Sequence, residues 1–213
     1  MAKTREGILG AFIGTIGPVT GYVRGGQNIL RSSTSTVKYK RTPLRAAQLE
    51  KIRVCNRFTK AFSQTGFFTK TFPAYGSTGN GYNRVTSALM SQALTGNYPG
   101  IRLSYPLVLI SKGKLPPAEH AAAAAMDNGN IYFSFTDNSE TGTASPTDKI
   151  ILVAYAEEQQ QAVFNLHAGL RKDCEAVLQA GMLKGCNVET WIGFLSSDET
   201  NAANSVYTGS IRL

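Results

Sequence analysis

The residue types that most often do chemistry are few in this sequence, and they form no catalytic or metal-binding pattern. His120 and His167 have no carboxylate or cysteine at a ligand or catalytic spacing. Glu119 precedes His120, but adjacent side chains of an extended segment point to opposite sides. Glu157 and Glu158 belong to an EEQQQ run that predicts a polar turn. We therefore expect no catalytic residues, no metal site and no enzymatic activity.

The cysteines and the glycine-rich start also argue against a reactive or cofactor-binding centre. The chain has an odd number of cysteines, and none of them lies at a metal-ligand spacing from another: Cys55, Cys174 and Cys186. This pattern predicts free thiols, and the alternative is a Cys174–Cys186 disulfide. No Lys-Ser or Lys-Thr pair closes the early glycines into a phosphate-binding loop. We expect no cofactor, and a small-molecule substrate is not expected either.

Cationic side chains near the N-terminus are the remaining candidates for contacts. They begin in the polar run SSTSTVKYKRT and continue along a predicted helix. Arginines on one helix face can bind phosphates through forked hydrogen bonds. The competing interpretation is contact with the acidic surface of another subunit. The predicted polyanion or subunit contacts are Lys38, Lys40, Arg41, Arg45, Arg53, Arg57 and Lys60.

The net charge of +8 is divided very unevenly along the chain. Residues 1–72 hold 13 Lys/Arg and 2 Asp/Glu, a net charge of +11, whereas residues 73–213 have a net charge of −3. A basic end attracts nucleic acid, anionic lipid or acidic protein surfaces, although a charge run is often only a solvated surface.

The segment GILGAFIGTIGPVTGYVRGGQNILR, residues 7–31, is unusually rich in glycine. One interpretation is strands that turn near Gly17-Pro18 and Gly25-Gly26; the other is a helix packed through its glycines. Because glycine costs a helix roughly 1 kcal/mol relative to alanine, we favour strands. We interpret the segment as an assembly arm that includes Gly7, Gly10, Gly14, Gly17 and Gly21.

Two helices are predicted after this arm. Thr42-Pro43 is typical of a helix start, and residues 43–62 place Leu44, Cys55, Phe58 and other apolar residues on one face, with Gly66 as an end signal. A shorter helix is predicted over residues 81–94.

From about residue 100 the apolar period changes to two, which predicts strands. About seven short strands over about 110 residues are typical of an immunoglobulin- or fibronectin-like sandwich. Trp191 and Phe194 should pack between its sheets, and the alanine run 121–125 should be a short helix or an extended linker. The predicted strands are Ile101–Ile110, Asn130–Thr136, Lys149–Tyr155, Ala162–Leu166, Glu175–Leu178, Val188–Leu195 and Ser205–Leu213.

These elements predict an α+β chain in two parts: a basic arm and helical region, residues 1–98, and an antiparallel β-sandwich, residues 99–213. Residues 7–23 carry no charge, but they are short for a membrane span and contain Pro18, so no integral span is expected. The start shows no convincing signal peptide, which favours cytoplasmic synthesis followed by incorporation into a virion or external assembly.

Several stretches resemble a known family along nearly the whole chain. They are GILGAFIGTIGPVTG, RGGQNILRS, TPLRAAQLEKIRVCNRF, YPLVLISKGKLP, FSFTDNSETGTASPTDKIILVAY and WIGFLSSDETNAANSVYTGSI. They resemble an uncharacterised family of Bacteroidota proteins of unknown function, a resemblance that implies no activity or site. The N-terminal pattern is also similar to that of small phage-encoded proteins with a Gly-rich hairpin, which favours a virion or other assembly component.

The sequence favours a structural protein that forms homo-oligomers by self-assembly into a particle, ring or filament. The alternative is a nucleic-acid-binding module that uses the basic N-terminal region. A third hypothesis, a carbohydrate- or surface-binding adhesin, requires Trp191 on an exposed face of the sandwich.

Overall fold

The chain divides into two compact units, each described by itself. The computed structural model describes residues 3–4, 10–33, 42–62, 66–76 and 79–213, so the predictions on Gly7, Lys38, Lys40 and Arg41 lie outside the described residues. The first unit is Met1–Arg41 and the second is Thr42–Leu213. This division differs from the boundary expected near residue 98, which falls inside the second unit.

The first unit is a small antiparallel sheet with the strand order β1-β2-β3-β4. Its turns fall at Gly17 (φ 53°) and at Gly25 and Gly26 (φ 58° and 79°), where the left-handed backbone favours glycine. The strand interpretation is therefore confirmed, and the glycine-packed helix is wrong. The strands are β1 Lys3–Thr4, β2 Phe12–Ile16, β3 Val19–Arg24 and β4 Gln27–Ser32.

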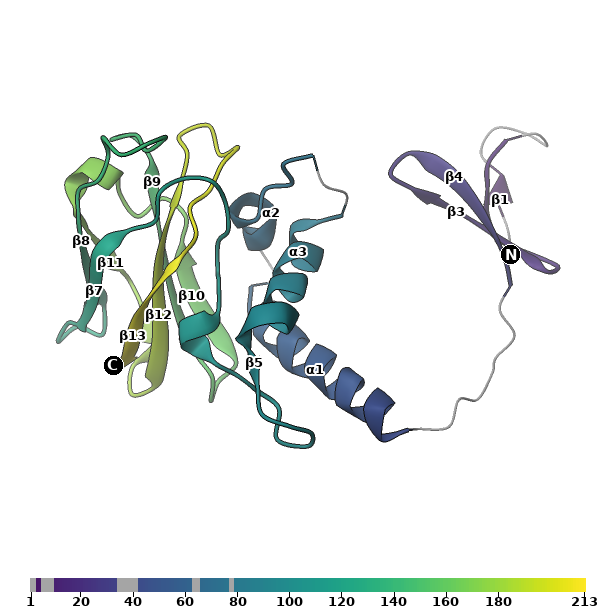
Figure 1. Cartoon of the computed structure of the whole chain (residues 1–213), viewed down its shortest axis with the longest axis horizontal. Coiled ribbons are helices and arrows are strands. Elements are labelled where there is room, and N and C mark those ends of the chain that lie inside the picture. The colour runs from purple at the N-terminus through teal and green to yellow at the C-terminus, as the bar shows by residue number, and fades with distance from the viewer. Residues whose placement is uncertain (1–2, 5–9, 34–41, 63–65, 77–78) are drawn as a thin grey trace. The chain divides into compact units, whose positions relative to one another are not determined.

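The second unit contains a β-sandwich (Figure 1), which confirms the predicted α+β class. One sheet has the order β11-β8-β7 and the other β10-β9-β12-β13, with every pair antiparallel. The first, second and fifth of the seven strands thus face the other four, as in a fibronectin-like sandwich. The strands are β7 Glu119–Ala125, β8 Ile131–Thr136, β9 Lys149–Ala156, β10 Gln161–Asn165, β11 Glu175–Leu178, β12 Asn187–Leu195 and β13 Val206–Arg212.

Two predictions at the start of the sandwich are wrong: the alanine run 121–125 is neither a short helix nor a linker, and most of the segment Ile101–Ile110 is not a strand. The alanine run belongs to strand β7, where Ala121 and Ala123 pack on the core. In the segment predicted as strand Ile101–Ile110, only Arg102–Leu103 (β6) is a strand, and it pairs with β5 Leu94–Thr95. Tyr105–Leu107 is a 3₁₀ turn, because Pro106 lacks the N–H that a ladder requires.

The helices are α1 Pro43–Lys60, α2 Phe67–Thr71 and α3 Gly81–Ala88. As predicted, Thr42 caps α1: its hydroxyl accepts a hydrogen bond from Arg45 N at 3.3 Å. Gly66, with φ 64°, does not end α1 but precedes α2, an element that the sequence did not predict. The second predicted helix is α3 extended by a π-helical turn, Leu89–Ala93. No helix among the described residues is long and apolar enough to cross a membrane.

The sheet β10-β9-β12-β13 lies between two hydrophobic cores. Ile150, Leu152 and Phe194 belong to the core between the two sheets. Ile151, Tyr155 and Trp191 belong to a second core, under the helices. The ring of Phe58 on α1 lies 5.0 Å from that of Tyr155 and 6.2 Å from that of Trp191. Phe194 therefore packs between the sheets as predicted, but Trp191 packs against the helices because side chains alternate along β12.

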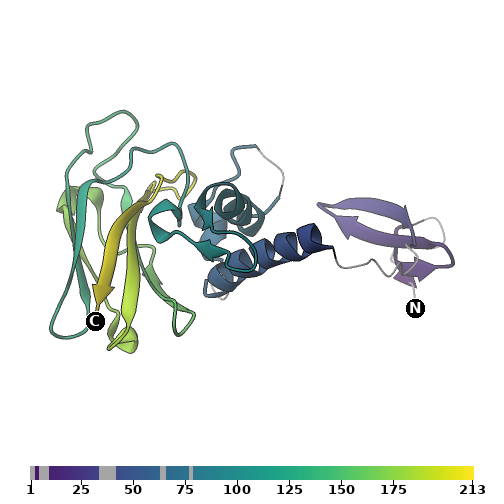
Figure 2. The same ribbon diagram turned by 60° about the horizontal axis from the view of Figure 1, so that its bottom comes forward.

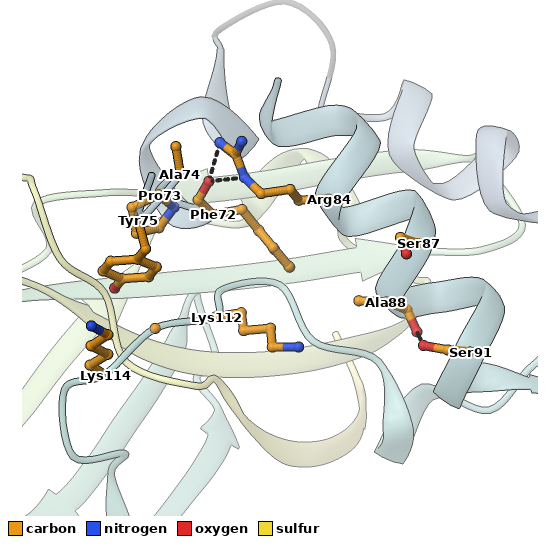
Figure 3. A pocket seen from close by; sticks show the side chains of 11 residues that line it. Phe72, Pro73, Ala74, Tyr75, Arg84, Ser87, Ala88, Ser91, Lys112 and Lys114 are labelled. Atoms are coloured by element: carbon orange, nitrogen blue, oxygen red, sulfur yellow. Dashed lines mark hydrogen bonds between the residues drawn. The ribbon is translucent and has the colours of Figure 1, made fainter. Parts of the chain in front are cut away.

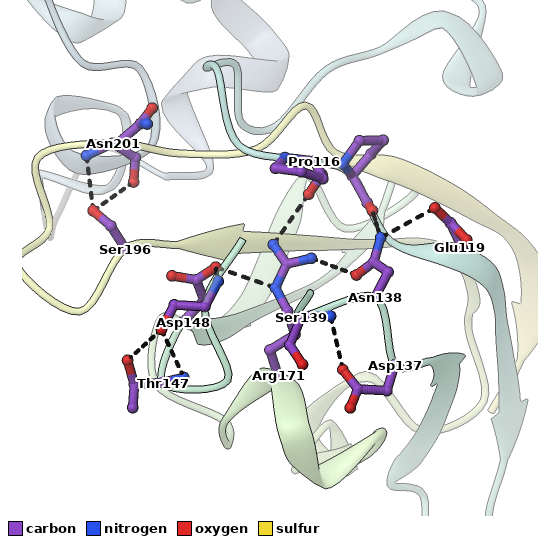
Figure 4. Close-up of polar contacts among 12 residues, drawn as sticks. Pro116, Glu119, Asp137, Asn138, Ser139, Thr147, Asp148, Arg171, Ser196 and Asn201 are labelled. Carbon is purple, nitrogen blue, oxygen red and sulfur yellow. Dashed lines mark hydrogen bonds and ion pairs between the residues drawn. The ribbon is translucent and has the colours of Figure 1, made fainter. Parts of the chain in front are cut away.

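A fully buried arginine, Arg171, holds one end of the sandwich (Figure 4). Its Nε donates to Asp148 Oδ2 at 3.1 Å, and its two Nη atoms donate to Asn138 Oδ1 at 2.5 Å and to the Pro116 carbonyl at 3.1 Å. The guanidinium carbon lies 3.7 Å from the ring centroid of Phe194. Burial lowers the pKa of Arg171 from its ordinary value, and the charge of Asp148 opposes that shift.

We predict that Arg171→Ala destabilises the second unit by about 3–5 kcal/mol, because it leaves Asp148 and two further acceptors without their buried donor. Urea unfolding followed by circular dichroism measures the change. The matched control is Lys172→Ala at the neighbouring exposed position, which should change stability by no more than about 0.5 kcal/mol. Equal unfolding midpoints for the two variants would contradict a stabilising role for this network.

Candidate functional site

No group of three His, Cys, Asp or Glu residues within the described ranges could hold a metal ion. The three cysteines are free thiols, and burial raises the pKa of Cys55, in the helix-side core, to about 11. At that pKa a thiol is a poor nucleophile at neutral pH.

His167 has an acidic partner that sequence spacing did not reveal. Its Nε2 lies 2.8 Å from Oε1 of Glu199, which also accepts from Lys149 Nζ at 2.8 Å. Lys70 Nζ on α2 contacts Oε2 of Glu199 at 2.7 Å. These partners are distant from one another in sequence, so no local sequence motif predicts the cluster. Hydrogen bonds from Lys149, Lys70 and His167 lower the pKa of Glu199 to about 2. A carboxylate with this pKa is a weak base, so we interpret the cluster as a clamp between α2 and the sandwich.

The predicted assembly arm forms a sheet with two chemically different faces. Residues directly opposite each other on neighbouring strands share a face, and the register pairs Gly14 with Gly21, Ile16 with Val19 and Gly21 with Leu30. Alternation along each strand then assigns the remaining residues. One face, called the apolar face below, consists of Phe12, Gly14, Ile16, Val19, Gly21, Val23, Asn28, Leu30 and Ser32.

Among the described residues the apolar face carries no charged side chain, and it is largely open. The side chains of Ile16, Val23 and Leu30 are 54%, 47% and 62% exposed. Among residues 3 and 10–33 of this unit, only Gly21 is buried. A Cβ on Gly21 would collide with the Phe12 carbonyl oxygen and would lie 2.9 Å from the Phe12 ring. Glycine at this position therefore allows the aromatic ring to lie flat against the neighbouring strand.

The opposite face of the same sheet is polar and basic. Arg24 and Arg31 lie on it, and the guanidinium of Arg31 sits 5.8 Å from the ring centroid of Tyr22. The hydroxyls of Thr15 and Thr20 are hydrogen-bonded across the strands at 3.0 Å. Ile13 and Ile29 also lie on this face, but among the described residues the charge of the sheet is confined to it.

The first half of α1 presents a second apolar surface. Figures 1 and 2 show that this end of the helix projects beyond the sheets it packs against. Leu44, Leu49 and Ile52, called the α1 patch below, are 84%, 51% and 36% exposed. The prediction that Leu44 shares the buried face of Cys55 and Phe58 is wrong, because no core lies beneath the first turn.

The structure brings together only some of the predicted basic residues. Arg57 and Lys60 line a hollow of about 410 Å³ with Gln160 of the β9–β10 turn and Gln161 at the start of β10. Arg53 is paired with Glu50 at 2.7 Å on the exposed helix surface. Arg45 lies in the first turn of α1, far along the helix from Lys60. Arg57 and Lys60 are therefore the pair best placed to meet one anionic partner.

Comparisons with known proteins identify one family. The model of a family of unknown function (DUF6266) matches residues 11–209. No curated protein and no solved structure gives a significant match.

We predict that Glu199→Gln lowers the melting temperature at pH 7, because it removes the charge that holds Lys70 and Lys149. The pKa of Glu199 is about 2 in the folded protein against an ordinary value of 4.5. Its stabilising contribution is thus fully present above about pH 4.5 and is lost as the pH falls toward 2. The difference between wild type and variant should shrink over that interval.

Melting curves between pH 2.5 and 7 measure this difference. Glu158→Gln, which removes the same charge from the exposed β9–β10 turn, is the control and should show a much smaller effect at pH 7. A difference for Glu199→Gln that does not change with pH would contradict the clamp.

Proposed function

The chain belongs to this family of unknown function, and from that premise we propose that it is a non-enzymatic structural protein that self-assembles into a larger particle, ring or filament. We place that assembly in a virion-like particle or at a cell surface. The similarity of the N-terminal pattern to that of small phage-encoded proteins supports the virion-like placement.

The observation that carries the proposal is the open apolar face of the N-terminal sheet. A sheet of this size without a core is marginal in water, because ordering the backbone costs roughly 1–2 kcal/mol per residue. Each Å² of apolar surface removed from water contributes about 25 cal/mol of stabilising free energy. The exposed Ile16, Val23 and Leu30 lie on the same uncharged face, so covering this face stabilises the strand arrangement.

We propose that the α1 patch of a neighbouring copy covers this face. Both surfaces carry exposed aliphatic side chains, which the contact removes from water. Because the two surfaces are different, the contact is head-to-tail, and repetition builds a ring or a filament. Both surfaces belong to residues 1–72, whose net charge is +11, so the contact is stabilised by burial of apolar surface and not by attraction between opposite charges.

The third hypothesis, an adhesin that presents Trp191, loses its basis. Trp191 is fully buried in the helix-side core and cannot serve as a stacking platform for a sugar. A specific observation does favour the nucleic-acid alternative: Arg57 and Lys60 share one hollow.

We predict that the wild-type chain forms large species in light scattering and particles, rings or filaments in negative-stain images, and that Leu30→Glu weakens this association at least tenfold. The reason is that the new carboxylate would be buried in an apolar contact. The matched control is Gln27→Glu, also on β4, which adds the same charge on the opposite face and should assemble normally.

Circular dichroism verifies that both variants keep the second unit folded. A wild-type chain that stays monomeric at high concentration would overturn the proposal, because the apolar face would then be covered within one copy or not at all. Equal loss of assembly in both variants would also contradict a specific role for the apolar face.

For the nucleic-acid alternative we predict binding to DNA or RNA that weakens steeply with salt. Replacement of Arg53, Arg57 and Lys60 by Ala should reduce the slope of log affinity against log salt by roughly 0.9 for each duplex phosphate that the variant no longer neutralises. The control removes the same charge from Lys172, Lys184 and Arg212, which are exposed in the sandwich. Absence of binding at low salt would eliminate this alternative.

A further inference from the structure

A second hollow in the Thr42–Leu213 unit has features that self-assembly does not explain. Its volume is about 430 Å³, and it lies between the α2–α3 connection, one side of α3 and the segment Lys112–Lys114 (Figure 3). Volumes of this order accommodate small organic molecules. Phe72, Pro73 and Ala88 provide an apolar wall, and Ser87 and Ser91 add hydroxyl groups.

The charge of this hollow is entirely positive. Arg84, Lys112 and Lys114 line it, and none of the described residues that line it has a carboxylate. Arg84 is fixed by two backbone carbonyls: its Nε and Nη2 donate to Phe72 O at 2.8 and 2.6 Å, and its Nη1 donates to Gly79 O at 2.8 Å. Because both acceptors are neutral, the positive charge of Arg84 stays uncompensated by them.

The two lysines are held on a rigid segment. Lys114 Nζ lies 5.0 Å from the ring centroid of Tyr75. Within the described ranges, the side chain of Lys112 makes no hydrogen bond or ion pair, and Figure 3 shows it beside the hollow. The backbone beneath is fixed because Lys112 N donates to Thr71 O at 3.0 Å and Lys114 N donates to Asn201 Oδ1 at 3.2 Å.

The aromatic residue at the edge of the hollow is strained. Tyr75 has φ 45°, a conformation that a bulky side chain rarely adopts. Its hydroxyl donates to Asn201, and that contact holds the ring beside Lys114. Gly113 completes the fit, since a Cβ there would collide with Ala202 O and would lie 2.5 Å from the Tyr75 hydroxyl oxygen. Such strain persists where the surroundings fix it, and it gathers at ligand sites.

The helix on the other side of the hollow is also irregular. Helix α3 changes to a π-helical turn at Leu89–Ala93, and Ser91 Oγ within that turn donates to Ala88 O at 3.0 Å. Single π-helical turns are frequent at functional sites because they redirect the side chains around them. Charge, strain and helix irregularity thus coincide at one cavity.

We infer that this hollow binds a small organic oxyanion, a phosphate ester or a carboxylate, that carries an apolar group. Lys112 and Lys114 meet the anionic oxygens, and Arg84 contributes its fixed positive charge. The apolar group lies against Phe72 and Pro73, while the Ser87 and Ser91 hydroxyls orient the ligand. The inference is independent of the proposed assembly, because it uses neither the apolar face nor the α1 patch.

Ligand-observed NMR titration tests the inference with the full-length chain, since saturation transfer works with assembled and monomeric protein alike. Three probes distinguish the ligand chemistry: phenyl phosphate, benzoate and neutral benzyl alcohol. We expect phenyl phosphate or benzoate to bind at least tenfold more tightly than benzyl alcohol. The stronger of the two anions identifies whether the site prefers a phosphate ester or a carboxylate.

Variants locate the binding. Lys112→Gln combined with Lys114→Gln should weaken binding of the preferred anion at least tenfold. Lys172→Gln combined with Lys184→Gln, which removes the same charge from exposed positions elsewhere in the sandwich unit, should leave it unchanged. Equal binding of benzyl alcohol, no binding of either anion, or equal effects of the two double variants would overturn the inference.

Discussion

The central strands β9 and β12 must be covered on both faces, and the rest of the second unit depends on that constraint. Ile150, Leu152 and Ala154 lie in the core between the sheets, while Ile151 and Val153 lie in the core under the helices. A sandwich alone would leave the second set in water. The helices of residues 43–93 are therefore a structural layer of the sandwich unit, which explains why the chain does not divide near residue 98.

The elements that sequence predicts well are those with a strong local signal. Thr42-Pro43 and the spacing of Cys55 and Phe58 identify α1, and alternating apolar residues identify most strands. The wrong predictions concern segments whose secondary structure or buried face is determined by tertiary contacts. Ala121–Ala125 has low strand propensity, yet it pairs with β8 because small side chains fit the edge of that core. Both neighbours of Trp191 in β12 are also apolar or uncharged, so periodicity could not show which face meets the helices.

The candidate sites were harder to predict than the strands and helices, because their residues come together only through contacts between segments that are distant in sequence. Glu199 meets Lys70, Lys149 and His167 only after folding, and the cationic hollow joins residues from three separate segments. Leu44 follows the helical period of the buried face, but the helix extends past its support and leaves this residue exposed. Turn signals and the cost of glycine in a helix predict the strands of the glycine arm, whereas the confinement of its basic residues to one face follows only from the strand register.

The two units differ in how much of their apolar surface is covered. The second unit closes two cores of its own, and a buried arginine network and a carboxylate clamp hold its loops. The first unit leaves Ile16, Val23 and Leu30 open on one face and keeps Arg24 and Arg31 on the reverse face, beside Ile13 and Ile29. Because no charge interrupts the open face, it can be covered without desolvating a cation. The open face of the first unit therefore supports our proposal of a subunit whose folding is completed by its neighbour, whereas the proposed ligand site needs only residues of the second unit.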